Sequence, residues 1–217
     1  MNHSGWESVL CHDGILRTFP LRPGALTRVD QDGTDSPGSS SLDRPDAGDV
    51  VAAAAGDAAA FERLVLAIQG RVWRYLVHLV GDRALAEDLA QEVLIRVYRK
   101  LDTLRDPEGF TSWVLVVARN AAYDAGRAKK RRPLELVPDP DANLRTTQGD
   151  PHLTAEVEDA LDRLDPDLRE AVVLVGMIGL SYREAAETIG VPEGTVKSRV
   201  FRARQTLHEM LGRADAG

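Results

Sequence analysis

The sequence predicts an all-α protein with two small helical domains joined by a flexible linker. From about Asp57 onward, apolar residues recur at intervals of three and four, which is the spacing of one helix face. No segment alternates convincingly between apolar and polar residues, as a half-buried strand would. Residues 133–152 hold four prolines and no periodicity, so they are expected to separate the two helical parts.

The composition is typical of a soluble globular protein. Hydrophobic residues make up 43% of the chain, and no run approaches the ~18 apolar residues that would predict membrane insertion. The N-terminus lacks the basic start and apolar core of a secretory signal. Cys11 is the single cysteine, which excludes an internal disulfide and a four-cysteine zinc site. We therefore expect a cytoplasmic protein with no membrane insertion.

Residues 1–50 are expected to form a disordered N-terminal extension. The stretch from Asp30 to Asp49 is rich in Asp, Gly, Ser and Pro, and it holds too few apolar residues to order itself. Scattered apolar side chains before it, such as Trp6 and Phe19, leave two alternatives open. The segment either binds a partner or results from a translation start assigned too early.

The first domain is predicted to span residues 51–132 and to contain three helices. They cover about residues 57–79, 83–101 and 111–130, and Gly81 ends the first of them. Ten acidic and fourteen basic residues lie in this domain, whereas the whole chain has a net charge of −7. The positive charge is therefore concentrated in part of an acidic protein.

The second domain is predicted to span residues 153–217. Its helices cover about residues 154–164, 165–178, 181–189 and 193–211. An Asp-Pro pair opens the second of these, with Asp as the N-cap and Pro in the first turn. The sequence Ser-Tyr-Arg-Glu is a capping box that opens the third.

The last two helices of this domain are predicted to form a helix-turn-helix. Ala186 is small enough for the two helices to approach closely, and Gly190 can adopt the positive φ that the turn needs. Val196 is expected to point back into the core. Small, glycine and β-branched residues at this spacing favour such a turn.

The last helix carries a concentrated basic face. No acidic residue lies between Gly194 and Leu207, although four basic residues do. The side chains expected to form one apolar stripe are Val196, Val200, Ala203, Leu207 and Leu211. Those expected to face away are Ser198, Phe201, Arg202 and Gln205, with Lys197 and Arg199 at the flanks. An exposed Phe beside arginines favours docking in a DNA major groove, and the alternative is a solvated, charged helix end.

Two helices of the first domain also carry mixed faces. Asp88, Gln91, Ile95 and Tyr98 share one face of the second helix, which is either a protein interface or a surface packed under a neighbouring helix. On the third helix, Trp113 begins a polar stripe that runs into the basic segment 126–132. This Trp either stacks on an unpaired base or is a half-buried core residue.

Three segments carry a family resemblance. "AEDLAQEVLIRVYRKL" (86–101) and "FTSWVLVVARNAAYDAGRAKKRR" (110–132) resemble sigma domain 2 of the sigma-70 family. "LDRLDPDLREAVVLVGMIGLSYREAAETIGVPEGTVKSRVFRARQTL" (161–207) resembles sigma domain 4. Two such domains joined by a short linker are similar to the extracytoplasmic-function (ECF, group IV) sigma factors. The resemblance covers about residues 57–212.

The resemblance implies a site for each partner. Core RNA polymerase would be bound through its β′ clamp helices and its β flap. The residues implied to bind the clamp are Asp88, Gln91, Glu92 and Ile95. Those implied to contact the −10 promoter element, around a loop at 102–110 that holds a flipped base, are Asp106, Phe110, Trp113, Asn120, Asp124, Arg127 and Arg131. Those implied to contact the −35 element are Thr195, Lys197, Ser198, Arg199, Phe201 and Arg202. An anti-sigma factor is implied as a further partner.

Two other functions fit the sequence less well than a sigma factor does. A stand-alone regulator that binds operators through the helix-turn-helix would leave the mixed faces of the first domain unexplained. An enzyme is not expected, because the chain holds no catalytic constellation and no glycine-rich phosphate loop. The histidines lack metal-ligand spacing, and His3, Cys11 and His12 supply at most three ligands, so neither a metal nor another cofactor is expected.

Overall fold

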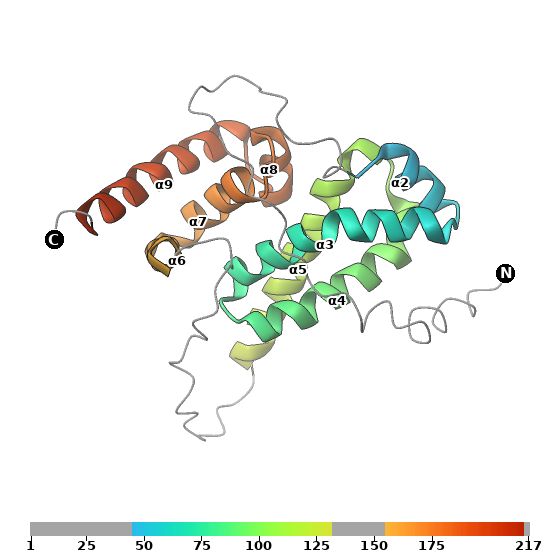
Figure 1. The fold of residues 1–217 in the computed structure, drawn as a ribbon, viewed down its shortest axis with the longest axis horizontal. Helices are drawn as coiled ribbons and strands as arrows, with labels where there is room; N and C mark the ends of the chain where they lie inside the picture. Colours follow the sequence, from blue (N-terminus) through green and yellow to red (C-terminus); the bar gives the residue numbers. More distant parts are fainter. Residues whose placement is uncertain (1–44, 132–154, 215–217) are drawn as a thin grey trace.

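The computed structural model describes residues 45–131 and 155–214, and all of its regular elements are helices. The N-terminal part and the C-terminal part lie side by side in Figure 1, with the first drawn in blue to yellow-green and the second in orange to red. The predicted linker at 133–152 and most of the predicted N-terminal extension lie outside the described residues. The all-helical prediction is confirmed for the part of the chain that is described.

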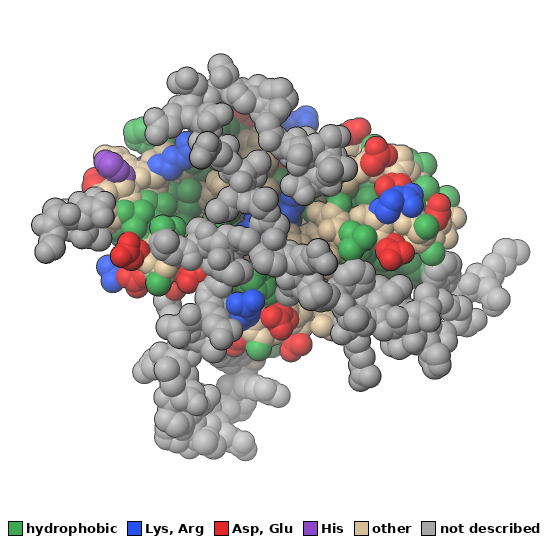
Figure 2. All heavy atoms as spheres, viewed as in Figure 1, with side chains coloured by type: hydrophobic (Ala, Val, Ile, Leu, Met, Phe, Trp, Pro, Cys, Tyr) green, Lys and Arg blue, Asp and Glu red, His purple; other side chains and the backbone are tan. Residues whose placement is uncertain are grey.

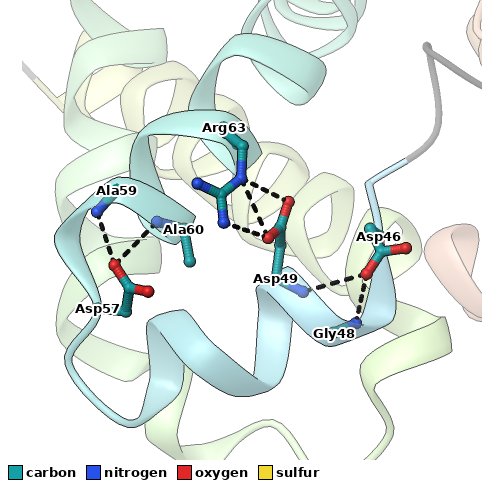
Figure 3. A network of polar contacts seen from close by, with 7 residues as sticks. All are labelled: Asp46, Gly48, Asp49, Asp57, Ala59, Ala60 and Arg63. Carbon is teal, nitrogen blue, oxygen red and sulfur yellow. Dashed lines mark hydrogen bonds and ion pairs between the residues drawn. The ribbon is translucent and has the colours of Figure 1, made fainter.

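The N-terminal part opens with a helical hairpin of α2 (Ala47–Ala54) and α3 (Ala58–Val80). Asp46 and Asp57 are the N-caps, and their carboxylates accept hydrogen bonds from backbone N–H groups in the first turns (Figure 3). Arg63 of α3 donates to both carboxylate oxygens of Asp49 in α2, so a bidentate ion pair joins the two helices. Hydrogen bonding to Arg63 lowers the pKa of Asp49 below its ordinary value.

The helix α2 corrects the predicted domain boundary at residue 51. Val50 is 2% exposed and belongs to the core, so ordered structure begins within the stretch that was assigned to the extension. The composition of residues 30–49 concealed this start, because Asp and Gly at 46–49 suggest a loop. They are instead the cap and first turn of a short helix that α3 covers.

Two further long helices complete the N-terminal part. They are α4 (Arg83–Lys100) and α5 (Phe110–Arg131), and two short 3₁₀ turns at Leu101–Thr103 and Pro107–Gly109 connect them. Gly81 ends α3, as predicted, and its backbone lies in the left-handed region. The helices pack around a shared apolar core, whose largest fully buried members include Leu64, Ile68, Val72, Leu76, Val93, Val97, Val114 and Leu115.

The C-terminal part consists of four α-helices and one π-helical segment. These are α6 (Ala155–Arg163), α7 (Pro166–Val172), α8 (Tyr182–Ile189) and α9 (Glu193–Ala214). A π-helix at Val173–Met177 continues α7, where the sequence predicted an uninterrupted helix to about residue 178. The other helix bounds agree with the predictions within a few residues.

The two parts pack directly against each other. Helix α5 contacts α8, and α3 contacts α7 and the π-helical segment. Leu174, Ile178 and Leu180 of the C-terminal part join the same buried apolar cluster as Leu76 and Ala118 of the N-terminal part. The sequence predicted two domains linked only by a flexible segment, and it did not predict this shared interface.

We predict that replacing Gly190 with Ala lowers the free energy of unfolding by about 1–2 kcal/mol, because Gly190 has a φ of 80° in the turn after α8. Gly70→Ala is the matched control. Gly70 lies inside α3 with open space at its Cβ position, so this change should raise stability by about 0.5–1 kcal/mol. Thermal unfolding followed by circular dichroism measures both. Equal destabilisation by both variants would contradict the prediction.

Candidate nucleic-acid interface

Helices α8 and α9 form a helix-turn-helix. The Ser181 side chain accepts a hydrogen bond from the Glu184 N–H, and the Glu184 carboxylate accepts one from the Ser181 N–H, so the capping box is complete. Gly190 is left-handed, and its N–H donates to the Ala186 carbonyl. Val196 is fully buried. The three positions that predicted the turn therefore take the places expected of them.

The exposed face of α9 carries the predicted mixture of basic, polar and aromatic side chains. Phe201 is 69% exposed, the largest value among the exposed large hydrophobic residues that the structure describes. Lys197, Ser198 and Arg202 are exposed on the same helix, and Thr195 is half-buried. On the opposite side, Val196, Val200 and Ala203 are buried, as the predicted stripe requires. An exposed Phe in a basic helix is unfavourable in water, and a nucleic-acid surface would cover it.

Arg199 differs from its predicted place at the flank of this face. Its guanidinium makes a short ion pair with Asp167 of α7, and its side chain is 15% exposed. Its place on the helix explains this low exposure. Arg199 lies three residues after Val196 and four before Ala203, so it sits beside the buried stripe. Arg199 therefore ties α9 to α7 in this structure.

Lys197 is held close to its own helix. Its ammonium lies 2.7 Å from the Glu193 carboxylate and 5.7 Å from the centre of the Tyr182 ring. Hydrogen bonding to Glu193 raises the pKa of Lys197, so the group is cationic at neutral pH. Glu193 is half-exposed and Lys197 is more exposed, so a phosphate can compete with the carboxylate for this cation.

The predicted polymerase-binding face lies on α4. Asp88, Gln91 and Glu92 are exposed, and Ile95 is half-buried. Glu92 accepts a hydrogen bond from Arg96 at 2.6 Å. Leu94, beside Ile95 in the sequence, is 9% exposed and belongs to the core. Tyr98 packs edge-on against Phe61, with ring centres 4.9 Å apart, and burial raises the pKa of its hydroxyl.

The exposed polar stripe on α5 holds part of the predicted −10 set. Asn120 and Asp124 are exposed, and Arg127 donates a hydrogen bond of 2.5 Å to Asp124. Trp113 is half-buried against the core, which is the second of the two alternatives that the sequence left open. The side chain of Arg131 lies outside the described residues.

Two residues at the start of α5 and in the loop before it have structural roles that the sequence did not predict. Phe110 is 2% exposed, because residues 110, 114 and 118 share the buried face of α5. Its ring is therefore not presented to a ligand in this structure. Asp106 is exposed, and its carboxylate accepts a hydrogen bond from the Glu108 N–H at 3.2 Å, which caps a short 3₁₀ turn.

The sequence did not single out a buried polar cluster where α3, α5 and α7 meet. We call Tyr75, Arg119 and Glu170 the Glu170 cluster. Glu170 accepts hydrogen bonds from the Tyr75 hydroxyl at 2.7 Å and from Arg119 Nε at 2.8 Å. One feature of the sequence could have indicated a buried carboxylate here. Glu170 stands directly before the apolar run from Ala171 to Val175.

The described residues hold neither a cluster of metal ligands nor a membrane-spanning helix. Among these, no group of three or more His, Cys, Asp or Glu side chains could hold a metal ion. No helix within 45–131 or 155–214 is long and apolar enough to cross a membrane.

Comparisons with known proteins agree with this geometry. A family model described as Sigma-70 region 2 matches residues 64–132, and one described as Sigma-70, region 4 matches residues 154–207. The chain is 37% identical over 190 residues to the ECF RNA polymerase sigma factor SigE of Mycolicibacterium smegmatis, covering 83% of this chain and 73% of that protein. It is 34% identical over 174 residues to the RNA polymerase sigma-H factor of Pseudomonas aeruginosa, covering 72% and 88%.

A solved structure of a sigma factor is also similar to this chain. The sigma factor RpoE of Bartonella quintana, determined in complex with the anti-sigma factor NepR, matches with a TM-score of 0.58 and 27% identity. The match covers 70% of this chain and 96% of that one. The fold and the exposed basic face of α9 thus define a two-part helical transcription protein.

The chain belongs to the sigma-70 family of RNA polymerase sigma factors, in its extracytoplasmic-function group. It is an alternative sigma factor for transcription initiation. Sigma factors are initiation factors rather than enzymes.

We predict that Arg199→Ala lowers the free energy of unfolding by about 0.5–1 kcal/mol, because it removes the ion pair to Asp167. Arg202→Ala is the matched control on the exposed face, and it should change stability by no more than about 0.5 kcal/mol. Urea unfolding of both variants measures the difference. A loss from Arg202→Ala equal to that from Arg199→Ala would contradict the assigned places.

Proposed function

We propose that this sigma factor reads the −35 element with the exposed face of α9 and the −10 element with α5 and the loop before it, while α4 binds core polymerase. The observation that carries the proposal is the 69% exposure of Phe201 on a basic helix-turn-helix surface. The two other faces support it, because their polar members are exposed on helices whose opposite sides are buried.

For the −35 element, α9 would enter the major groove with its first turns. Ser198, Phe201 and Arg202 are the side chains best placed to reach base edges, since all three are exposed. Phe201 suits a thymine methyl group, and Arg202 suits the O6 and N7 acceptors of guanine. Thr195 and Lys197 would contact phosphates near the helix N-terminus. Arg199 would act indirectly, because its ion pair with Asp167 sets how α9 sits on α7.

For the −10 element, the exposed part of α5 would contact the separated strands. Asn120 offers both donors and acceptors, Arg127 offers a cation, and the face of Trp113 offers stacking. Asp106 lies on the exposed loop that would hold a flipped base. Phe110 would shape this pocket from below, because its ring lies in the core at 6.4 Å from the Trp113 ring. Arg131 would add a phosphate contact.

For polymerase, the exposed carboxylates and amide of α4 would bind the β′ clamp helices. Asp88, Gln91 and Glu92 would supply polar contacts, and half-buried Ile95 would supply an apolar one. The C-terminal part would bind the β flap. Transcription takes place in the cytoplasm of bacteria, so we propose that location. The similarity to RpoE, which binds NepR, supports an anti-sigma factor as a further partner.

We predict that Asp88→Ala combined with Gln91→Ala weakens binding to core polymerase by about tenfold or more, because two exposed polar contacts of the interface are lost. Fluorescence anisotropy of the labelled chain titrated with core polymerase measures the change. Glu62→Ala together with Gln69→Ala is the control, because these residues lie on α3 outside the proposed face. Wild-type affinity in the α4 variant, with its fold intact, would remove the assignment.

We predict that Arg202→Ala weakens discrimination at the −35 element by about 1–3 kcal/mol, because a bidentate base contact is lost. The matched control is Arg204→Ala, an exposed base further along α9 that lies outside the proposed set. Transcription from a promoter library randomised at the −35 element, with core polymerase present, measures the preference. An unchanged preference in Arg202→Ala would contradict the proposed base contact.

The runner-up function, a stand-alone operator-binding regulator, makes a different prediction for the same chain. Such a regulator would bind duplex DNA tightly and specifically without core polymerase. A sigma factor of this kind would show promoter selectivity only in the presence of core polymerase.

A further inference from the structure

The first turn of α9 holds an acidic side chain beside the residues proposed to read the −35 element. Glu193 is the first residue of the helix, and the Lys197 ammonium lies 2.7 Å from its carboxylate, one turn further on. Both side chains are about half exposed, and the same ammonium lies 5.7 Å from the centre of the Tyr182 ring. Glu193 and Glu209 are the two acidic residues of α9, and only Glu193 lies next to the proposed DNA contacts.

The three cations proposed for the −35 element differ in what holds them. Arg199 is paired with Asp167, and its side chain is only 15% exposed, so solvent has little access to it. Arg202 donates to the carbonyl of Ser198 in its own helix at 3.4 Å. Lys197 combines a carboxylate partner with an exposed position. An exposed ion pair is weak in water, so a second anion can displace the carboxylate from Lys197.

Glu193 also occupies the place where a helix attracts phosphate. The first backbone hydrogen bonds of α9 run from the N–H groups of Thr195 and Val196 to the carbonyl of Pro192. The N–H groups before Thr195 are therefore among the unsatisfied donors at the start of the helix, and such donors favour an anion. A DNA phosphate and the Glu193 carboxylate are drawn to the same donors and to the same ammonium. Because both are negative, each disfavours the other at this place.

We infer that Glu193 is a positioning residue that weakens the contact between Lys197 and DNA phosphate. Its carboxylate competes with the phosphate for the ammonium, so the helix-turn-helix gains less from the DNA backbone, which is alike in every sequence. Selection of the −35 element then depends more on the side chains proposed to reach base edges, such as Phe201 and Arg202. The inference rests on the proposed function of α9 as the −35 reader.

The competition has a signature in the salt dependence of DNA binding. Each phosphate that a cation neutralises on duplex DNA steepens the fall of the binding constant with salt by about 0.9 in logarithmic slope. Glu193→Gln keeps the size of the side chain and removes its charge, which frees Lys197 to neutralise a phosphate. We expect binding about threefold tighter near physiological salt, which is the size of effect that an exposed ion pair controls. A merely structural role predicts the opposite sign, because an acid in the first turn stabilises a helix.

The test measures binding of the holoenzyme, formed from core polymerase and the full chain, to two labelled duplexes over a series of KCl concentrations. One duplex is a promoter fragment identified by run-off transcription with this chain, and the other is the same fragment with its −35 element scrambled. The variants are Glu193→Gln, Lys197→Ala and the two combined. Glu209→Gln is the matched control, because it makes the same chemical change at an exposed position of the same helix. It lies roughly 24 Å along α9 from Glu193, well beyond the Debye length of about 8 Å.

We expect Glu193→Gln to tighten binding to both duplexes by the same factor, with a salt slope steeper by about 0.9. The preference for the intact −35 element should stay unchanged, because a phosphate contact carries no sequence information. Glu209→Gln should bind like the wild type. In the Lys197→Ala background, the gain from Glu193→Gln should shrink to less than about twofold.

Unchanged or weaker binding by Glu193→Gln would overturn the inference. A gain of equal size in the Lys197→Ala background would also overturn it, because Glu193 would then act without Lys197. A changed preference between the two duplexes would show that Glu193 contacts a base, which contradicts competition for a phosphate-binding cation. Absence of promoter-specific transcripts from the wild-type holoenzyme would instead overturn the proposed function.

Discussion

The relative placement of the two helical parts depends on the buried carboxylate of Glu170. Apolar contacts between α5 and α8 favour packing, but such contacts are tolerant of small shifts between helices. A buried carboxylate does not tolerate such shifts, because its burial without hydrogen bonds from Arg119 and Tyr75 costs several kcal/mol. The cluster therefore selects one arrangement among several that bury similar apolar area. A network of this kind contributes more to specificity of packing than to overall stability.

Most of the proposed contact residues are exposed although the two parts pack against each other, and Arg127 of α5 also lines the pocket between the parts. The exposed residues of α4, the polar stripe of α5 and the basic face of α9 remain accessible with the two parts packed together.

The helices themselves were predictable from the sequence because local signals determine them. Asp57, Ser181, Gly81 and Gly190 mark helix ends by capping and by left-handed backbone, which depend only on neighbouring residues. The burial of Val196, Val200 and Ala203 followed from helical periodicity in the same way. The resemblance to sigma domains 2 and 4 then placed these helices in a family that the comparisons confirm.

Contacts between distant segments were not predictable. Asp167 turns Arg199 away from the exposed face, and nothing near either residue in the sequence indicates the pair. The core position of Phe110 was available from its spacing to residues 114 and 118, but the family resemblance implied a contact with the −10 element for it. Val50 was missed because its helix is short and begins in a segment of loop-like composition. Glu170 and Arg119 lie 51 positions apart, so no local pattern connects them.

Run-off transcription tests the central claim most directly. The purified chain would be added to core RNA polymerase on a pool of genomic fragments, and the transcripts would be sequenced. We predict defined start sites whose upstream regions share two spaced motifs, and loss of those transcripts when core polymerase is incubated without the chain. Tight and specific binding of duplex DNA by the chain alone, without promoter-specific transcripts in the presence of polymerase, would contradict the assignment.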